Sequence, residues 1–112
     1  MYNKDISEKM LSDAFDMMDN IRESKRVCKD IVDRNKMKMN STEFGCIMEA
    51  LDVIDELDNK TKKDVAEMLD INGEVRGYNT ETYLRLINLY EGIVKSNKEV
   101  YDRRNYIREK YM

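Results

Sequence analysis

The 112-residue sequence contains no histidine, no proline and no tryptophan, and it has only two cysteines and four glycines. Without histidine, the chain cannot build a site in which an imidazole activates serine or cysteine, or a zinc site that needs imidazole. Two cysteines are too few for a disulfide framework, and Cys28 and Cys46 lack the close spacing of a metal or redox pair. We interpret them as reduced thiols that behave as small apolar residues.

Long apolar runs are missing as well. No stretch approaches the ~20 residues that span a bilayer, and the amino terminus lacks the basic-then-apolar pattern of a signal peptide. We therefore expect a cytoplasmic protein with no membrane segment. Acid–base catalysis would need a pocket that no pattern indicates, and no glycine-rich phosphate loop is present. The sequence favours a protein that is not an enzyme and that uses no cofactor, metal or small-molecule substrate.

Charged residues make up 38% of the chain, against a usual ~25%. Residues 1–40 carry 9 basic and 8 acidic side chains (+1), residues 41–77 carry 4 and 10 (−6), and residues 78–112 carry 7 and 5 (+2). An acidic centre is not typical of a general nucleic-acid-binding protein, which has a basic face. The acidic residues of this centre are interpreted as a solvated helix face, or as a surface for a basic partner; they include Glu49, Asp52 and Glu56.

Apolar residues recur at helical spacing along the chain, and no segment alternates with the period of two that is typical of a strand. We predict one domain over residues 1–112, with helices at about 5–38, 42–57, 61–71 and 80–111. At ~1.5 Å per residue, the first and last helices are each ~45–50 Å long, too long for a spherical domain. The predicted fold is an all-α, elongated antiparallel bundle of three to four helices, with a long first helix, a kinked middle pair and a long last helix.

Capping residues place the helix ends. Asn40 or Ser41 is expected to start the second helix, and Asn79 or Thr80 the last. Gly73 has the residue type that commonly ends a helix in the left-handed conformation.

The middle of the chain contains a further capping signature. Thr61 followed by Asp64 has capping-box spacing, which predicts a turn or kink at 58–61 between the second and third helices.

The segment 70–81, "DINGEVRGYNTE", resembles an EF-hand loop. Asp70, Asn72, Glu74 and Glu81 stand at ligand positions of such a loop. Val75, however, occupies the position where the sharp turn needs glycine, and there is no second loop of this kind in the sequence. A calcium-responsive module is therefore a minor alternative to a connector rich in capping and turn residues.

Residues 61–90 also resemble a helix-turn-helix, because "TKKDVAEMLDI" has the apolar and small residues of its first helix. The following helix would offer a set of polar side chains to DNA bases, namely Arg76, Asn79, Thr80, Thr82 and Arg85. The connector is longer than the usual three or four residues. The same Val-Ala-x-x-Leu pattern also fits the core face of a short amphipathic helix, so a DNA-binding regulator is the second hypothesis.

The apolar stripe of the last helix is wide at first and thin after residue 95, where tyrosine and arginine become frequent. These residue types dominate protein–protein hot spots. The predicted partner-binding residues are Tyr101, Arg104, Tyr106, Arg108 and Tyr111. We expect another chain to complete this thin stripe.

The leading hypothesis is a small helical interaction protein, of the accessory or inhibitor type, that self-associates and acts by binding another macromolecule. Its partner is a protein or a second copy, with nucleic acid as the alternative. The abundance of Lys, Asn, Ile, Asp and Met is typical of an AT-rich genome, and the chain's size and composition fit a protein of a bacterial mobile element.

Overall fold

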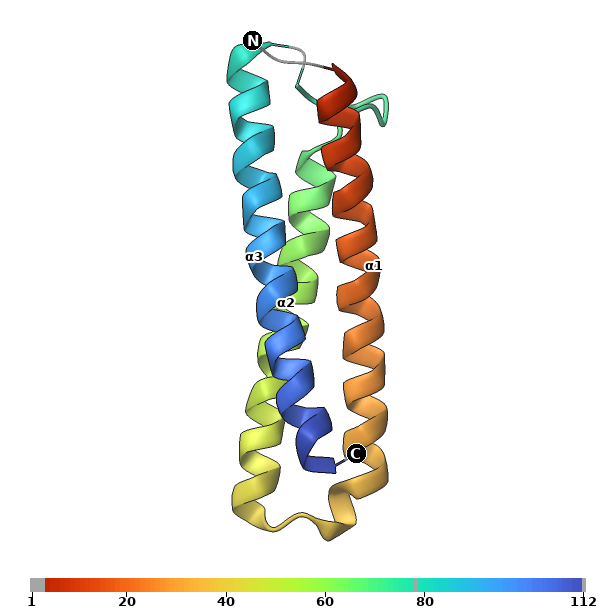
Figure 1. The fold of residues 1–112 in the computed structure, drawn as a ribbon, viewed down its shortest axis with the longest axis vertical. Helices are drawn as coiled ribbons and strands as arrows, with labels where there is room; N and C mark the ends of the chain where they lie inside the picture. Colours follow the sequence, from red (N-terminus) through yellow and green to blue (C-terminus); the bar gives the residue numbers. More distant parts are fainter. Residues whose placement is uncertain (1–3, 78, 112) are drawn as a thin grey trace.

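Three long helices form the part of the chain that this computed structural model describes, residues 4–77 and 79–111 (Figure 1). Their bounds are α1 Lys4–Asn35, α2 Ser41–Glu67 and α3 Thr80–Tyr111, and a short 3-10 helix, η1, spans Lys36–Lys38. Each long helix packs against the other two, and the molecule measures 55 × 21 × 18 Å. Its radius of gyration of 16.9 Å exceeds the ~13 Å of a compact domain of this size. The predicted elongated all-α bundle is confirmed.

The starts of α2 and α3 follow the caps predicted from the sequence. The side chain of Asn40 accepts a hydrogen bond from the backbone N–H of Glu43 at 2.8 Å. The side chain of Asn79 accepts one from the backbone N–H of Thr82 at 2.9 Å. Each bond satisfies a donor that the helix start would otherwise leave unpaired. The bounds predicted for the last helix, 80–111, agree with α3.

The turn predicted at 58–61 is wrong, because α2 continues through these residues as one helix. Ile47, Ile54 and Thr61 are seven residues apart and each is completely buried. The core-facing stripe therefore crosses the expected break without interruption. Thr61 has the type and spacing of a cap, but its position on the buried face keeps it inside the helix.

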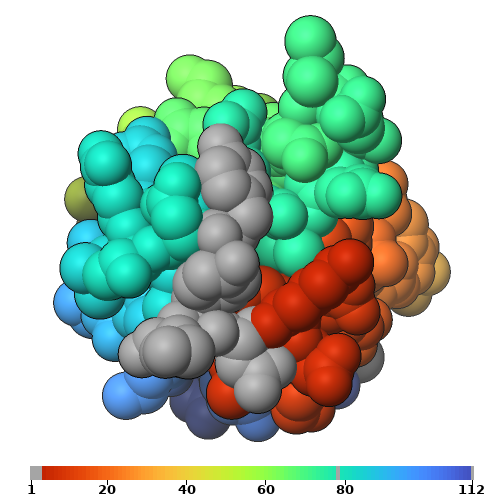
Figure 2. Space-filling view, turned by 90° about the horizontal axis from the view of Figure 1, so that it is seen from above, coloured from red at the N-terminus to blue at the C-terminus, as the bar shows by residue number. Residues whose placement is uncertain are grey.

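The predicted extension of a helix to residue 71 is also wrong, since α2 ends at Glu67 and the chain then forms a small hairpin-like turn. Leu69 and Val75 make an isolated antiparallel bridge, and the Asp70 N–H donates to the Glu74 carbonyl at 2.7 Å. Gly73, with φ 79°, lies within this turn and not at a helix end. The segment stands out from the end of the bundle (Figure 2).

Seven-residue repeats build the core, as in a coiled coil. The buried repeats are Ser7, Ala14, Ile21 and Cys28 in α1, then Ile47, Ile54, Thr61 and Met68 along α2 and its C-cap, and Leu86, Ile93, Val100 and Ile107 in α3. The apolar members form two separate clusters, one toward each end of the bundle. Each helix thus presents one row of buried residues to the other two, and polar residues separate the two apolar clusters near the middle.

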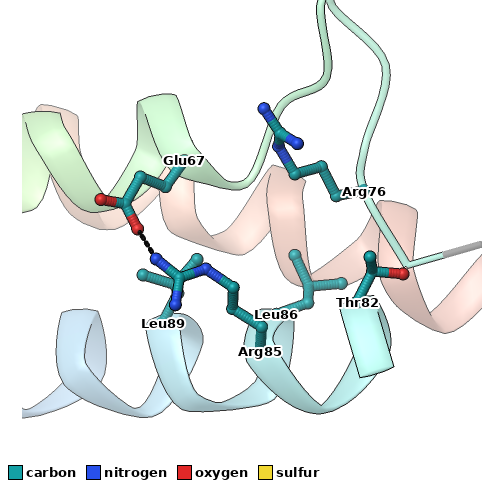
Figure 3. Close-up of a pocket in the computed structure, with 6 residues that line it drawn as sticks. All are labelled: Glu67, Arg76, Thr82, Arg85, Leu86 and Leu89. Atoms are coloured by element: carbon teal, nitrogen blue, oxygen red, sulfur yellow. Dashed lines mark hydrogen bonds and ion pairs between the residues drawn. The ribbon is translucent and has the colours of Figure 1, made fainter. Parts of the chain in front are cut away.

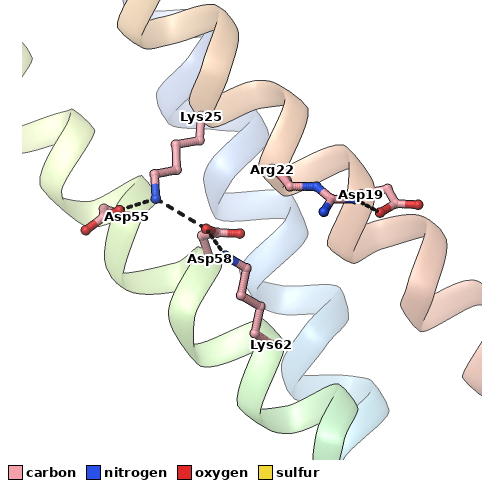
Figure 4. A network of polar contacts seen from close by, with 6 residues as sticks. All are labelled: Asp19, Arg22, Lys25, Asp55, Asp58 and Lys62. Carbon is pink, nitrogen blue, oxygen red and sulfur yellow. Dashed lines mark hydrogen bonds and ion pairs between the residues drawn. The ribbon is translucent and has the colours of Figure 1, made fainter.

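This interruption is a buried polar layer between α1, α2 and α3. Its uncharged members are Ser24, Thr61 and Ser96, and its carboxylate is Asp58, which is only 1% exposed. Lys25 Nζ lies 3.4 Å from Asp58 Oδ2 and also pairs with Asp55 (Figure 4). The hydrogen bond to Asp55 raises the pKa of Lys25 and lowers the pKa of Asp55.

Gly77 is needed where the connector meets the bundle. Its φ is 127°, and a Cβ there would lie 2.7 Å from Ser7 Oγ and 3.2 Å from Leu86 Cδ2. We expect Gly77→Ala to lower the free energy of unfolding by about 2 kcal/mol, from backbone strain and the close contact. Gly45→Ala, in α2 with open space around it, should raise that free energy by about 0.5–1 kcal/mol. Urea unfolding followed by circular dichroism measures both, and a neutral Gly77→Ala would contradict the described packing.

Candidate interaction surface

A hollow of about 260 Å³ lies between α2 and α3 beside the connector (Figure 3). Its lining contains three of the residues predicted for DNA contact, Arg76, Thr82 and Arg85. Each of the three is engaged within the chain. Arg85 Nη2 donates to Glu67 Oε2 at 2.5 Å, and Arg76 Nε donates to the carbonyl of Leu69 at 2.6 Å.

Thr82 takes part in the start of α3 together with Asn79, through the capping bond given above and a second one. The Asn79 N–H donates to Thr82 Oγ1 at 3.2 Å. Thr80, the first residue of α3, is exposed at the same end of the bundle. The five residues predicted for DNA contact therefore gather at one end, but their side chains mainly build the connector and the helix start.

The arrangement of α2 and α3 differs from a helix-turn-helix. In that motif, two helices cross at ~90–120° and the second lies free to enter a groove. Here α2 and α3 run antiparallel side by side (Figure 1), and α3 buries Leu86 in the core near its start. The geometry does not favour the DNA-binding hypothesis.

The acidic oxygens of the connector serve the turn itself. Asp70 Oδ1 accepts the backbone N–H of Asn72 at 2.8 Å and that of Glu74 at 3.0 Å. Among residues 4–77 and 79–111, no three acidic or cysteine side chains come together in a group that could hold a metal ion. The geometry of Asp70 fits turn formation rather than the calcium hypothesis.

The residues predicted to bind a partner lie in the C-terminal half of α3 but do not form one patch. Tyr101 and Tyr106 are 52% and 39% exposed, and Arg108 is also exposed. Arg104 turns toward α1, where its Nη1 donates to Ser24 Oγ at 3.3 Å. Tyr111 donates its hydroxyl to Glu43 on α2 at 3.1 Å.

The thin stripe of this half is completed by the chain's own helices, so the expectation that another chain completes it is wrong. Val100 and Ile107 are 1% and 0% exposed and belong to the core cluster formed with α1 and α2. A narrow apolar stripe was expected to be too small to be buried within the chain. It is buried nevertheless, because two neighbouring helices cover it from both sides.

A second row of side chains runs along α3 beside the buried one. We call it the outer row; it consists of Tyr83, Ile87, Tyr90, Val94, Asn97 and Tyr101. The steps between its members alternate between four and three residues, which is the spacing of a coiled-coil seam. None of its members is fully buried: Tyr83 and Tyr90 are half-buried and pack against a core cluster, and Val94 and Tyr101 are 42% and 52% exposed.

The outer row could be traced in the sequence through the apolar doublets Ile93/Val94 and Val100/Tyr101. In each doublet the first residue is buried and the second is exposed. Sequence reasoning merged the two rows into one wide stripe, because only the positions of the neighbouring helices show where one ends and the other begins.

An acidic row on α1 borders the outer row. Tyr90 Oη donates to Asp13 Oδ2 at 3.4 Å, which joins the two helices at this border. Burial, together with the carboxylate of Asp13, raises the pKa of the Tyr90 hydroxyl. Asp16 and Glu23 follow Asp13 on the same face of α1 at helical spacing, and both are exposed. These three residues are called the acidic flank.

No protein-family model, no curated protein and no solved structure gave a significant match to the chain. None of the described helices contains an apolar segment long enough to cross a membrane. The surface features of the bundle are therefore the basis for a functional proposal.

Proposed function

We propose that this protein is a small helical interaction protein, of the accessory or inhibitor type, which self-associates and acts by binding. The proposal rests on one observation, the outer row of α3. A helix that only served this bundle would need apolar residues on its core side alone. α3 carries, beside its core side, the outer row in coiled-coil spacing over residues 83–101. Tyr83 and Tyr90 of this row also pack against the core, whereas Val94 and Tyr101 are exposed and have no such role.

The row has the composition of an interface core. Ile87 and Val94 supply aliphatic contacts, and the three tyrosines supply large, stiff, amphipathic side chains of the type enriched at hot spots. At ~1.5 Å per residue the row is about 27 Å long, roughly half of the 55 Å molecule. A surface of this size fits a weak, reversible association between helices.

Light scattering tests the proposal. At about 200 µM, a concentration suited to weak interfaces, we expect the mass to rise above the 13.4 kDa of one chain toward twice that value. Val94→Glu places a charge in the middle of the row and should weaken the association at least ~10-fold, equivalent to ~1.4 kcal/mol.

Tyr106→Glu is the matched control, because Tyr106 lies on the same helix, off the row, with 39% exposure against 42% for Val94. It should leave the association unchanged, and circular dichroism should show that both variants retain the helical fold. A wild-type protein that remains a monomer at the highest concentration would refute self-association.

A further inference from the structure

We infer that the occupant of the outer row is a second copy of this chain, packed parallel and in register, so that Asn97 of one copy meets Asn97 of the other. This inference rests on the self-association proposed above and specifies its geometry. In a parallel two-fold pair, every residue of the row faces its own counterpart. The single polar member, Asn97, then decides which alignment is favourable.

Asn97 is half-buried in the row, and a partner helix would remove more of its amide from water. Two asparagine amides satisfy each other, since each has both a donor and an acceptor. An antiparallel pair centred on the same row would place Asn97 opposite Ile87, where the amide has no polar counterpart. An unpaired buried amide is unfavourable, and a single asparagine in such a seam is known to select register.

The acidic flank disfavours the antiparallel pair for a second reason. In that pair the flank of one copy faces the flank of the other, and Asp13 and Asp16 lie at the level of its centre. Like charges held face to face are repulsive. In the parallel pair, the acidic flank of each copy instead faces the side of the second copy's outer row that lies away from α1.

That side of the outer row carries Lys98, an exposed residue one position beyond Asn97. α1 and α3 run in the same direction, with Tyr90 beside Asp13 and Arg104 near Ser24. Lys98 therefore lies at a height between Asp16 and Glu23. Glu23 is already paired with Arg26 of its own helix, so in the parallel pair Lys98 is attracted chiefly to Asp16 of the second copy. Glu91 lies on the same side and opposes this attraction.

The row ends at Tyr101, and the next residue in the four-three spacing is Arg104. Its guanidinium carbon lies 4.8 Å from the ring centroid of Tyr101, and its Nη1 bonds to Ser24 of α1. Two arginines would face each other if the parallel seam extended further. The side chain of Arg104 instead points toward α1, which is consistent with a seam that stops at residue 101.

Disulfide crosslinking tests the alignment in a Cys46→Ser background, because Cys46 is exposed. Cys28 can stay, since burial raises the pKa of its thiol to about 11 and keeps it protonated. We expect Ile87→Cys and Asn97→Cys, each alone, to form a covalent dimer under mild oxidation. Asp102→Cys, exposed on α3 but off the row, controls for random collision and should crosslink far more slowly.

The two introduced positions separate the alignments, because they lie about 15 Å apart along α3, and a disulfide needs Cα atoms within about 7 Å. Crosslinking of both single variants supports the parallel pair. Crosslinking only in a mixture of the two overturns it in favour of the antiparallel pair. A dimer by light scattering in which neither crosslinks overturns the outer-row geometry, whereas a wild-type monomer overturns the proposed function itself.

Discussion

Val100→Asp is expected to unfold the protein, whereas Tyr101→Asp is expected to leave it folded. The two residues are neighbours in α3, but Val100 is 1% exposed and Tyr101 is 52% exposed. A carboxylate at position 100 would lie among apolar side chains of the core cluster that includes Ile21, Ile54 and Ile107. A buried and unpaired charge of this kind costs more than about 4 kcal/mol, a large share of the ~5–15 kcal/mol total stability of a domain.

At position 101 the new carboxylate would stay in water. The loss there is limited to contacts at the helix surface, including the stacking of Arg104 on the Tyr101 ring, so we expect a change of about 1 kcal/mol or less. Circular dichroism with urea unfolding distinguishes the two variants, measured at low protein concentration so that association does not contribute. If both variants unfold alike, or if Val100→Asp is harmless, the division of α3 into a buried row and an outer row is refuted.

Lys25→Met is expected to lower the free energy of unfolding by about 3 kcal/mol, because it leaves the carboxylate of Asp58 buried with less compensation. Asp58 is 1% exposed, and its Oδ2 lies 3.4 Å from Lys25 Nζ and 3.0 Å from Lys62 Nζ. Lys62 is half-exposed and remains in the variant, which keeps the expected loss at the lower end of the range for a broken buried pair.

The double variant Lys25→Met/Asp58→Leu provides the control. It removes both charges from the layer, and replacing a buried ion pair with apolar residues is often neutral or stabilising. Within the described residues, Asp58 Oδ1 has no hydrogen-bond partner, so its removal also removes an unsatisfied buried atom. We expect the double variant to recover at least the wild-type stability in urea unfolding. A double variant as unstable as the single one would show that Lys25 acts by packing alone.

The polar layer also bears on how the helices align. An all-apolar seam with seven-residue repeats tolerates a shift by one repeat, because each layer resembles the next. In this bundle Lys25 reaches Asp55 and Asp58 only in the observed alignment of α1 and α2. A shift of one repeat would separate these charges and place Asp58 against apolar residues. The layer therefore favours one register, at a cost in stability.

The sequence by itself determined the fold class, the starts of the three long helices and the end of the last one. The 3.6-residue apolar periodicity is a property of each segment, and the Asn40 and Asn79 caps act within three residues of themselves. Such local preferences agree with the final structure at both ends of α3 and at the start of α2. Local signals suffice there because no tertiary contact competes with them.

Only the tertiary structure decided the features that depend on neighbouring helices. Thr61 and Asp64 carry a local capping signature, but burial of the whole α2 face makes the helix continuous through it. Both adjacent rows of α3 contain apolar and aromatic residues, and packing against α1 and α2 fully buries only one of them. The physical reason is that periodicity defines the faces of a helix, whereas the position of its neighbours selects which face is withdrawn from water.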